Sequence, residues 1–259
     1  MEILRQFWES TYISLEGAYG LAALGVFAIL FLALTLRASL RQPFDIRPLP
    51  AAEKIRSAVA WATETGEPVH MALGTGGLGD LSTADTLAGL SLVSHLAQRG
   101  ALAEVPVHVR VGDPTALAGA LAVLQQGAAS TGYPDVFEPT QAEFVAPAPL
   151  AYAAGVAQAI RREPLAGNAM VGAFGPEMLL PALAGIERGL PQIGGTSSPA
   201  IAPLFAGTME APLVGEEIYA LGAALGRVEH TGSLAAQDLF RILLACGIIA
   251  VTVLGLLGI

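Results

Sequence analysis

The sequence predicts an α/β fold, a mostly parallel Rossmann-like sheet with helices on both faces, together with an N-terminal and a C-terminal transmembrane helix. Two observations lead to this prediction. In the middle of the chain, short β-type runs alternate with runs of helical periodicity, which is typical of strand–helix–strand units in a parallel sheet. Near the two ends, the stretches 17–36 and 242–259 contain no charged residue. Each is close to the length that a helix needs to cross a hydrocarbon core of about 30 Å.

The first uncharged stretch, 17–36, is expected to be a membrane-spanning helix. A buried helix of a globular core is one alternative, but such helices rarely stay apolar on every face over this length. A cleaved signal peptide is the other alternative, but it would follow a basic region, whereas the preceding residues include Glu2, Glu9 and Glu16. Residues 1–16 are therefore expected to form an extracytoplasmic or interfacial segment.

Basic residues predict the orientation of this helix. Arg37, Arg41 and Arg47 follow it, within the proline-containing range 37–50 that we interpret as a juxtamembrane linker, and only Arg5 precedes it. Basic residues are enriched on the cytoplasmic side of membrane helices. The domain that follows is therefore expected in the cytoplasm.

The second uncharged stretch, 242–259, is expected to be a second span, with Arg241 on its domain side. The alternative is a helix buried in the core of an oligomer. This stretch contains Cys246, the single cysteine of the chain, so no internal disulfide and no thiolate metal cluster can form. With both spans in place, the chain is a multi-pass protein of the cell membrane with two spans.

The range 51–238 is expected to be the cytoplasmic α/β domain. The runs that we interpret as strands are short and apolar; they are 69–73, 105–111, 143–146, 169–174 and 192–194. The runs that we interpret as helices have apolar residues at helical spacing; they are 51–66, 82–98, 114–129, 147–162, 176–188 and 215–226. Because the two kinds of run alternate, the strands are expected to form a mostly parallel sheet.

Composition favours a membrane, an assembly, or both. The chain is 53% hydrophobic and 14% charged, which is more apolar and less charged than an average soluble domain. The range 51–238 contains eight basic and eighteen acidic residues, a net charge of −10. Such a charge repels polyanions, so no nucleic acid is expected as a partner. The Ala- and Gly-rich helices 114–129 and 147–162 have few charges, and we expect some of this surface to pack against another subunit.

The strongest candidate for a binding site is the turn GTGGLGD. Gly74, Gly76 and Gly79 have the G-x-G-x-x-G spacing between a predicted strand and a predicted helix, the context in which this motif holds a pyrophosphate. Thr75 could add a hydroxyl contact. Against this, Asp80 follows directly and would repel a phosphate. An ordinary glycine-rich turn between strand and helix is the alternative.

Other predicted turns belong to the same edge of the sheet. Asp113, Glu177, Thr196 and Ser197 each lie at or after the end of a predicted strand, and the carboxyl ends of parallel strands form the ligand crevice of open α/β sheets. These side chains, with Thr75 and Asp80 of the glycine turn, are therefore expected to line a small-molecule site. The alternative is that they only cap helices and stabilise turns.

Other residues give weaker indications of a site. Glu216 and Glu217 open a predicted helix, where the helix dipole favours carboxylates, with paired metal ligation as the alternative. The histidines have no ligand spacing and are interpreted as packed or surface residues; they are His70, His95, His108 and His230. No G-x-S-x-G nucleophile motif is present. The sequence therefore assigns no catalytic residue and no metal ligand, and leaves the cofactor open.

Four motifs together resemble a known group of proteins. HMALGTGGLGD, VGAFGPE, QIGGTSSPAI and LVGEEIYALGAALG, placed between two apolar ends, look like an uncharacterised family of bacterial membrane-anchored proteins, a domain of unknown function. The resemblance implies a bacterial setting and a membrane anchor. It implies no reaction and no catalytic residue.

We expect the chain to be a membrane-anchored scaffold that self-associates into a homo-oligomer through its α/β domain. Weak contacts become effective when anchoring confines the subunits to a plane and raises their effective concentration. The expected partners are therefore the lipid bilayer and further copies of the chain. One alternative is a membrane-tethered nucleotide-binding protein or enzyme that uses the glycine-rich turns. A third class is an accessory subunit of a transporter or respiratory complex.

Overall fold

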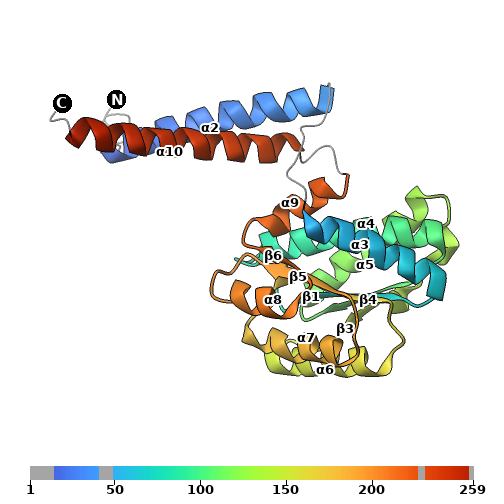
Figure 1. Cartoon of the computed structure of the whole chain (residues 1–259). Helices are drawn as coiled ribbons and strands as arrows, with labels where there is room; N and C mark the ends of the chain where they lie inside the picture. Colours follow the sequence, from blue (N-terminus) through green and yellow to red (C-terminus); the bar gives the residue numbers. More distant parts are fainter. Residues whose placement is uncertain (1–14, 41–48, 227–230, 257–259) are drawn as a thin grey trace, which may run out of the picture. The chain divides into compact units, whose positions relative to one another are not determined.

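A computed structural model describes residues 15–40, 49–226 and 231–256 (Figure 1). The chain divides into two compact units. One is the α/β unit, Arg47–Gly226, and the other is a terminal unit formed by Met1–Ile46 with Arg227–Ile259. The compact α/β unit thus ends before the limit of the expected range 51–238, because residues 231–238 belong to a helix of the terminal unit.

The α/β unit is built on a six-stranded sheet in the order β3-β2-β1-β4-β5-β6. The strands are β1 Val69–Gly74, β2 Val107–Val111, β3 Ala142–Phe144, β4 Gly167–Ala173, β5 Gln192–Thr196 and β6 Ala211–Val214. All neighbouring pairs run parallel. The central strand β1 is buried along its whole length, as expected of a strand that is covered on both faces. The predicted α/β fold with a parallel sheet is confirmed.

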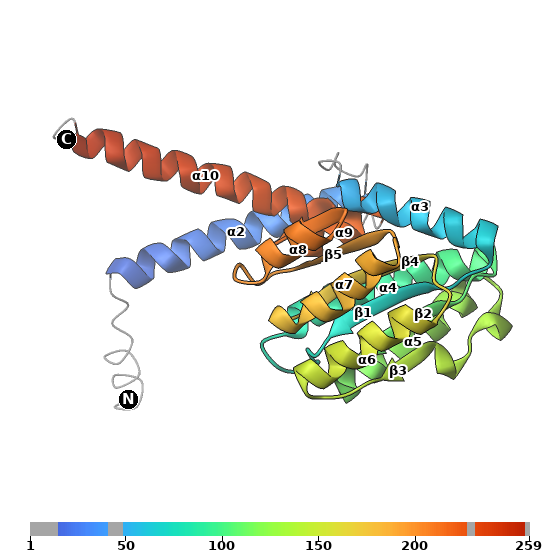
Figure 2. The same cartoon turned by 60° about the horizontal axis from the view of Figure 1, so that its bottom comes forward.

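Helices cover both faces of this sheet (Figures 1 and 2). One face carries α3 Pro50–Thr65, α4 Thr83–Ala103, α5 Pro114–Ser130 and α9 Glu217–Ala224, and the other carries α6 Pro149–Arg162, α7 Leu179–Glu187 and α8 Ala202–Thr208. Single 3₁₀ turns are found at Pro134–Val136, Pro139–Gln141 and Pro176–Met178. Successive strand residues face opposite sides, so Met71 and Val171 belong to the first core while Ala72 and Met170 belong to the second.

The last strand is the main difference from the prediction. The sequence predicts no element between 194 and 215, but the structure has α8 and β6 there. Strand β6 is only four residues long and includes Pro212, which lacks an N–H and is tolerated at a sheet edge. A short strand that contains proline gives little β-type signal, which explains why the sequence pattern does not reveal it.

The terminal unit is a pair of antiparallel helices, α2 Leu15–Leu40 and α10 Thr231–Leu256. Phe27 packs edge-on against Phe240, with ring centroids 5.1 Å apart. The end of α2 meets the start of α10 at Gly232, where a Cβ would lie 2.6 Å from Thr35 Cα. Glycine at 232 therefore allows the two backbones to approach more closely than a side chain would permit.

Within the described residues, one stretch is long and apolar enough to cross a membrane, Gly20–Arg37, with a mean hydropathy of 2.1 and no buried residue. It coincides with the first predicted span, 17–36. Helix α2 then continues to Leu40, into the range expected as a linker. The second predicted span, 242–259, falls mostly on α10. Positions 1–14, 41–48 and 257–259, to which the remaining terminal predictions refer, lie outside the described residues.

Candidate functional site at the carboxyl edge of the sheet

The strand order changes direction between β1 and β4. From β1 the chain proceeds outward to β2 and β3, then returns beside β1 as β4 and proceeds outward on the other side through β5 and β6. This is the strand order of Rossmann folds, in which the loops after the two strands at the reversal leave a crevice for a ligand. The turn GTGGLGD follows β1, so it lies at this point. The glycine turn therefore lies where Rossmann folds have their ligand crevice, and binding of a ligand there stays a prediction.

Gly74 joins the ends of three strands. Its φ is +80°, and a Cβ at this position would lie 1.9 Å from the carbonyl oxygen of Ala173 at the end of β4. Its N–H donates to the Tyr152 hydroxyl (3.0 Å), and its carbonyl accepts from the N–H of Gly112 after β2 (2.9 Å). Close packing alone therefore accounts for glycine at this position.

The rest of the glycine turn is hydrogen-bonded within the protein. The N–H of Thr75 donates to the Ala173 carbonyl (3.1 Å), and the N–H of Gly77 donates to Ser82 Oγ (3.0 Å). The N–H of Leu78 donates to Thr115 Oγ1 (2.7 Å). The N–H groups of Gly79 and Asp80 both donate to Thr83 Oγ1 (2.8 and 3.0 Å). Gly76 packs so closely that a Cβ would lie 2.7 Å from both Ala173 Cβ and Ser82 Oγ. A phosphate cradle needs backbone N–H groups that point outward. In this turn most of those groups stabilise the turn itself.

Two carboxylates lie in or beside the turn. Asp80 accepts from both the N–H and the hydroxyl of Ser82, at 2.7 and 2.6 Å, and Asp113 is the N-cap of α5 and accepts from Thr115 N–H at 2.7 Å. A Cβ on Gly77 would lie 2.8 Å from Asp113 Oδ1. Hydrogen bonds from Ser82 lower the pKa of Asp80, and those from Thr115 lower the pKa of Asp113. Both groups are therefore ionised at neutral pH and oppose a phosphate at the turn.

Glu177 and Thr196 belong to turns of their own. Glu177 accepts from the N–H of Gly175 at 2.8 Å, which closes the turn after β4. Thr196 is buried at the end of β5, and its carbonyl accepts from the N–H of Gly215 at 3.1 Å. Neither side chain is hydrogen-bonded to the glycine turn in the described structure. Their observed role matches the alternative interpretation, in which polar residues stabilise turns.

Ser197 joins a different cluster. Its hydroxyl donates to Asp85 Oδ2 of α4 at 2.7 Å, and the Tyr219 hydroxyl of α9 donates to Asp85 Oδ1. Partial burial, together with the hydrogen bond to Asp85, raises the pKa of Tyr219. The cluster ties α4 to α9 and to the end of β5. The Asp85 carboxylate accepts hydrogen bonds from two hydroxyl groups, and within the described part of the chain no histidine that could act as a base is bonded to this cluster.

The comparison with protein families gives one match, which covers nearly the whole chain. A family model for a domain of unknown function, DUF6754, matches residues 10–259. The chain belongs to the DUF6754 family. The match includes both terminal helices as well as the α/β unit, and it confirms the resemblance to an uncharacterised family. A search of curated proteins and a search of solved structures found no match to the chain.

Glu216 and Glu217 open α9 in this DUF6754 domain. Glu217 Oε2 accepts from the N–H of Val214 at 3.0 Å, so its carboxylate stabilises the turn before the helix. Among the residues that the structure describes, no group of three or more His, Cys, Asp or Glu side chains could hold a metal ion.

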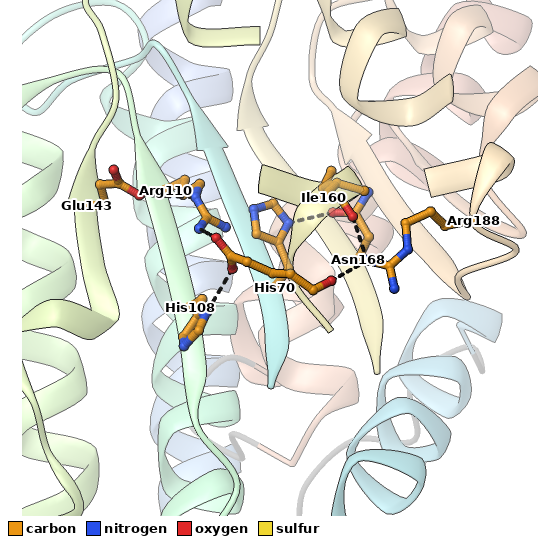
Figure 3. A network of polar contacts seen from close by, with 8 residues as sticks. His70, His108, Arg110, Glu143, Ile160, Asn168 and Arg188 are labelled. Carbon is orange, nitrogen blue, oxygen red and sulfur yellow. Dashed lines mark hydrogen bonds and ion pairs between the residues drawn. The ribbon is translucent and has the colours of Figure 1, made fainter. Parts of the chain in front are cut away.

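A second polar group is buried in the DUF6754 sheet, and Figure 3 shows two of its members, His70 and Asn168. It lies on the face covered by α6 and α7. His70 on β1, Asn168 on β4 and Gln192 on β5 are each at most 2% exposed. His70 Nδ1 lies 2.7 Å from Asn168 Oδ1, Asn168 Nδ2 donates to Gln192 Oε1 at 2.8 Å, and Gln192 Nε2 donates to the Ala182 carbonyl at 2.9 Å. We call these three side chains the buried polar row.

The direction of these bonds fixes the tautomer of His70. The Ala182 carbonyl can only accept, so Gln192 must present its amide nitrogen there and its oxygen to Asn168. Asn168 therefore presents its own oxygen to His70, whose Nδ1 must carry the proton. Burial, and then the nearby charge of Arg110, lower the pKa of His70 to about 3. His70 is thus neutral, with the lone pair on Nε2.

Arg110 lies on the side of the His70 ring opposite Asn168 (Figure 3). It is 6% exposed and forms ion pairs with Glu143 (3.3 Å) and Glu163, and Glu163 also contacts His108 Nδ1 at 3.1 Å. Among the described residues, neither Arg110 Nη1 nor His70 Nε2 has a hydrogen-bond partner. The carbonyl of Arg110 accepts from Tyr152, the same hydroxyl that holds Gly74. One side chain thus connects this polar group to the glycine turn.

The sequence analysis does not identify the buried polar row. Its signal was nevertheless present, because the runs VHMAL, GNAMV and QIGG each carry a single polar residue near the start of an otherwise apolar strand. Parallel strands in register bring such positions together on one face. Tyr152 and Asp85 gave no comparable signal, since each lies on a helix and reaches the site only through tertiary packing.

Proposed function

We propose that this chain is a membrane-anchored scaffold, held in the cell membrane by two spans and associating with further copies through its α/β unit. The candidate span Gly20–Arg37 supports the first anchor. The second anchor is proposed for α10, where Ile242, Leu243, Ile248 and Ile249 are all exposed. In water, a helix pair with apolar side chains exposed on both members is unfavourable, whereas a hydrocarbon core accommodates it.

The distribution of basic residues supports a cytoplasmic α/β unit. Arg37 lies in the last turn of α2, Arg41 and Arg47 follow the helix, and Arg241 precedes the apolar part of α10. The positive-inside preference then places both domain-side ends of the helix pair in the cytoplasm. This orientation is the second part of the proposal.

The observation that carries the proposed association is an apolar strip on α7. Leu180, Leu183 and Ile186 are 38, 47 and 50% exposed, and their spacing of three places them along one side of the helix. Full burial of one such side chain contributes roughly 1.5–3 kcal/mol relative to exposure. Burial of the exposed part of three side chains is a weak contact in solution, but tethering in a membrane raises the effective concentration at which it forms.

The second candidate function is the binding of a nucleotide or another small molecule at the glycine turn. The strand order favours it, because the turn lies where Rossmann folds bind their ligands. The internal hydrogen bonds of the turn and the charges of Asp80 and Asp113 count against it. Stabilisation of the wild-type chain that increases with the concentration of NAD or ATP would support this function over the scaffold.

Sizing of the purified full chain in mild detergent tests the scaffold. We expect particles larger than one chain for the wild type, and a shift towards single chains for Leu183→Glu, which puts a charge into the strip. Leu102→Glu is the matched control, because Leu102 is 58% exposed on α4, on the other face of the sheet. A wild-type chain that stays single at every concentration, in detergent and in bilayer discs, would overturn the proposal.

A further inference from the structure

A hollow of about 270 Å³ lies between α3 and α4 on the surface of the α/β unit. Its walls are Arg56, Val59 and Ala60 of α3 and His95 and Arg99 of α4. On α3, Val59 and Ala60 follow Arg56 by three and four residues, and on α4 Arg99 follows His95 by four, so the members on each helix lie on one side of it. Val59 and Ala60 give the hollow apolar walls, and Arg56 and Arg99 bring two guanidinium groups to it. Nothing in the sequence motifs pointed to this place.

Arg56 and Arg99 differ from Lys54, Arg110 and Arg161 of this acidic domain, which form ion pairs with carboxylates. Lys54 pairs with Glu210 at 2.7 Å, and Arg161 pairs with Glu187 at 3.0 Å. No ion pair within the described residues involves either Arg56 or Arg99. A domain with an excess of carboxylates thus keeps two cationic groups together at one hollow without a carboxylate between them.

A hydrogen bond holds the Arg56 guanidinium group in place. Its Nη2 donates to the carbonyl of Ala224, the last residue of α9, at 2.9 Å. A guanidinium has five N–H donors, so this bond fixes the group and leaves other donors for a ligand. Arginine suits phosphate because its planar fork can form two parallel, charge-assisted hydrogen bonds.

We propose that this hollow binds a phosphate group, from an anionic lipid headgroup or from a soluble phosphate ester. Arg56 and Arg99 contact the phosphate oxygens, while Val59 and Ala60 pack against the apolar part of the ligand. The lipid source rests on the proposed membrane anchoring: only nine residues separate the end of α2 from the start of α3. Basic clusters close to a span on the cytoplasmic side attract anionic headgroups.

Thermal unfolding of the full chain in neutral detergent tests the site directly. Inorganic phosphate is the probe, with sodium chloride at equal ionic strength as the reference. We expect the midpoint to rise with phosphate concentration beyond the chloride effect. Arg99→Gln should weaken the apparent affinity about tenfold, since hydrogen bonds to charged groups contribute on that scale. Arg56→Gln combined with Arg99→Gln should remove the shift.

Arg162→Gln is the control, because Arg162 is an exposed arginine on α6, on the other face of the sheet; it should keep the shift. Arg99→Gln is also expected to fold normally, since the Arg99 side chain forms no hydrogen bond or ion pair with the other described residues that the substitution could break. A phosphate shift that is absent from the wild type, or that survives in the double variant, would overturn the proposal.

Bilayer discs distinguish the two sources. Discs of phosphatidylcholine are compared with discs that also contain phosphatidylglycerol. A higher midpoint in the anionic discs that depends on Arg56 and Arg99 identifies the lipid source. A phosphate effect in detergent without such a lipid effect identifies a soluble ester. The detergent experiment needs no bilayer, so it still tests phosphate binding if the proposed membrane anchoring is wrong. Conversely, absence of the phosphate effect would not contradict the anchoring.

Discussion

His70 Nδ1 lies 2.7 Å from Asn168 Oδ1 across the junction of β1 and β4, in the centre of the sheet and out of contact with solvent. The pair sits on the two strands between which the strand order reverses. It therefore joins the two halves of the sheet by a side-chain bond, in addition to the backbone ladder between β1 and β4.

Replacement of Asn168 by Ala is expected to destabilise the α/β unit strongly. The change leaves the His70 Nδ1–H and Gln192 Oε1 without their partner, and each buried group without a partner costs about 1–3 kcal/mol. Chemical denaturation followed by circular dichroism measures the loss. Gln158→Ala, an exposed change on α6, is the control and should unfold like the wild type. Equal stability of the two variants would show that the buried polar row contributes little.

Acidification is expected to destabilise the fold through His70. Its pKa is about 3 in the folded chain, against an ordinary value of about 6.5 for histidine, so protons bind preferentially to the unfolded chain as the pH falls below about 6.5. The stability is fully present above that pH and decreases below it, by about 2 kcal/mol at pH 5. Unfolding free energies at pH 7 and pH 5 measure the effect.

The matched variants for this test are His70→Gln and His108→Gln. Without an imidazole at position 70, the loss between pH 7 and pH 5 should shrink by that amount. His108→Gln should keep the loss, because His70 is still present. The same pH slope in the wild type and in His70→Gln would contradict the assignment.

Substitution in the glycine turn should depend on position. Gly74→Ala is expected to be severe, since its Cβ would clash with the Ala173 carbonyl at 1.9 Å. Gly79 also has a positive φ, of +108°, but nothing lies within 4 Å of a Cβ at this position. Gly79→Ala is therefore expected to lower stability only through backbone strain, by about 1 kcal/mol. Thermal midpoints of the two variants test this order. A tolerated Gly74→Ala would mean that the ends of β1 and β4 can separate.

Asp113→Ala is expected to cost about 1 kcal/mol, the usual loss for removal of an N-cap side chain. Asp113 accepts from Thr115 N–H at 2.7 Å and from Ala116 N–H at 3.3 Å at the start of α5. Asp135→Ala is the control, because Asp135 is exposed in the 3₁₀ turn Pro134–Val136, whose N-cap residue is Tyr133. Denaturation midpoints compare the two. If Asp113→Ala were instead neutral while increasing nucleotide binding, the acidic turn would be a barrier to ligands rather than a structural cap.

Much of the fold could be predicted from local patterns. The turn from α3 into β1 shows why: Gly66 has φ +71° and ends the helix as predicted, and the apolar run after it is a buried strand. The alternation of such units determines a parallel sheet. Strand β6 could not be predicted in the same way, because its four residues include Pro212 and are specified by pairing with β5.

The sequence pattern predicted where the glycine turn lies in the fold, but the glycine motif did not predict how the turn is hydrogen-bonded. The spacing of Gly74, Gly76 and Gly79 gives no indication that Ser82, Thr83 and Thr115 accept the hydrogen bonds of the turn. Ser82 and Thr83 lie at the start of α4, within five residues of the N–H groups that they bond. Thr115 belongs to α5, so its contact with the turn forms only once α5 has packed. The same holds for the hollow at Arg56 and Arg99, whose residues are 43 positions apart in the sequence and meet only through helix packing.

Because Thr35 of α2 lies against Gly232 of α10, the chain between them, which includes the α/β unit, is a loop closed by this helix pair. While the helix pair stays together, the unfolded α/β chain has fewer conformations than a chain with free ends, so its entropy is lower. For a permanent closure of about 200 residues the loop-entropy relation gives up to roughly 5 kcal/mol in favour of the folded form. A fragment cut free of both helices should therefore melt at a lower temperature than the same fold in the whole chain.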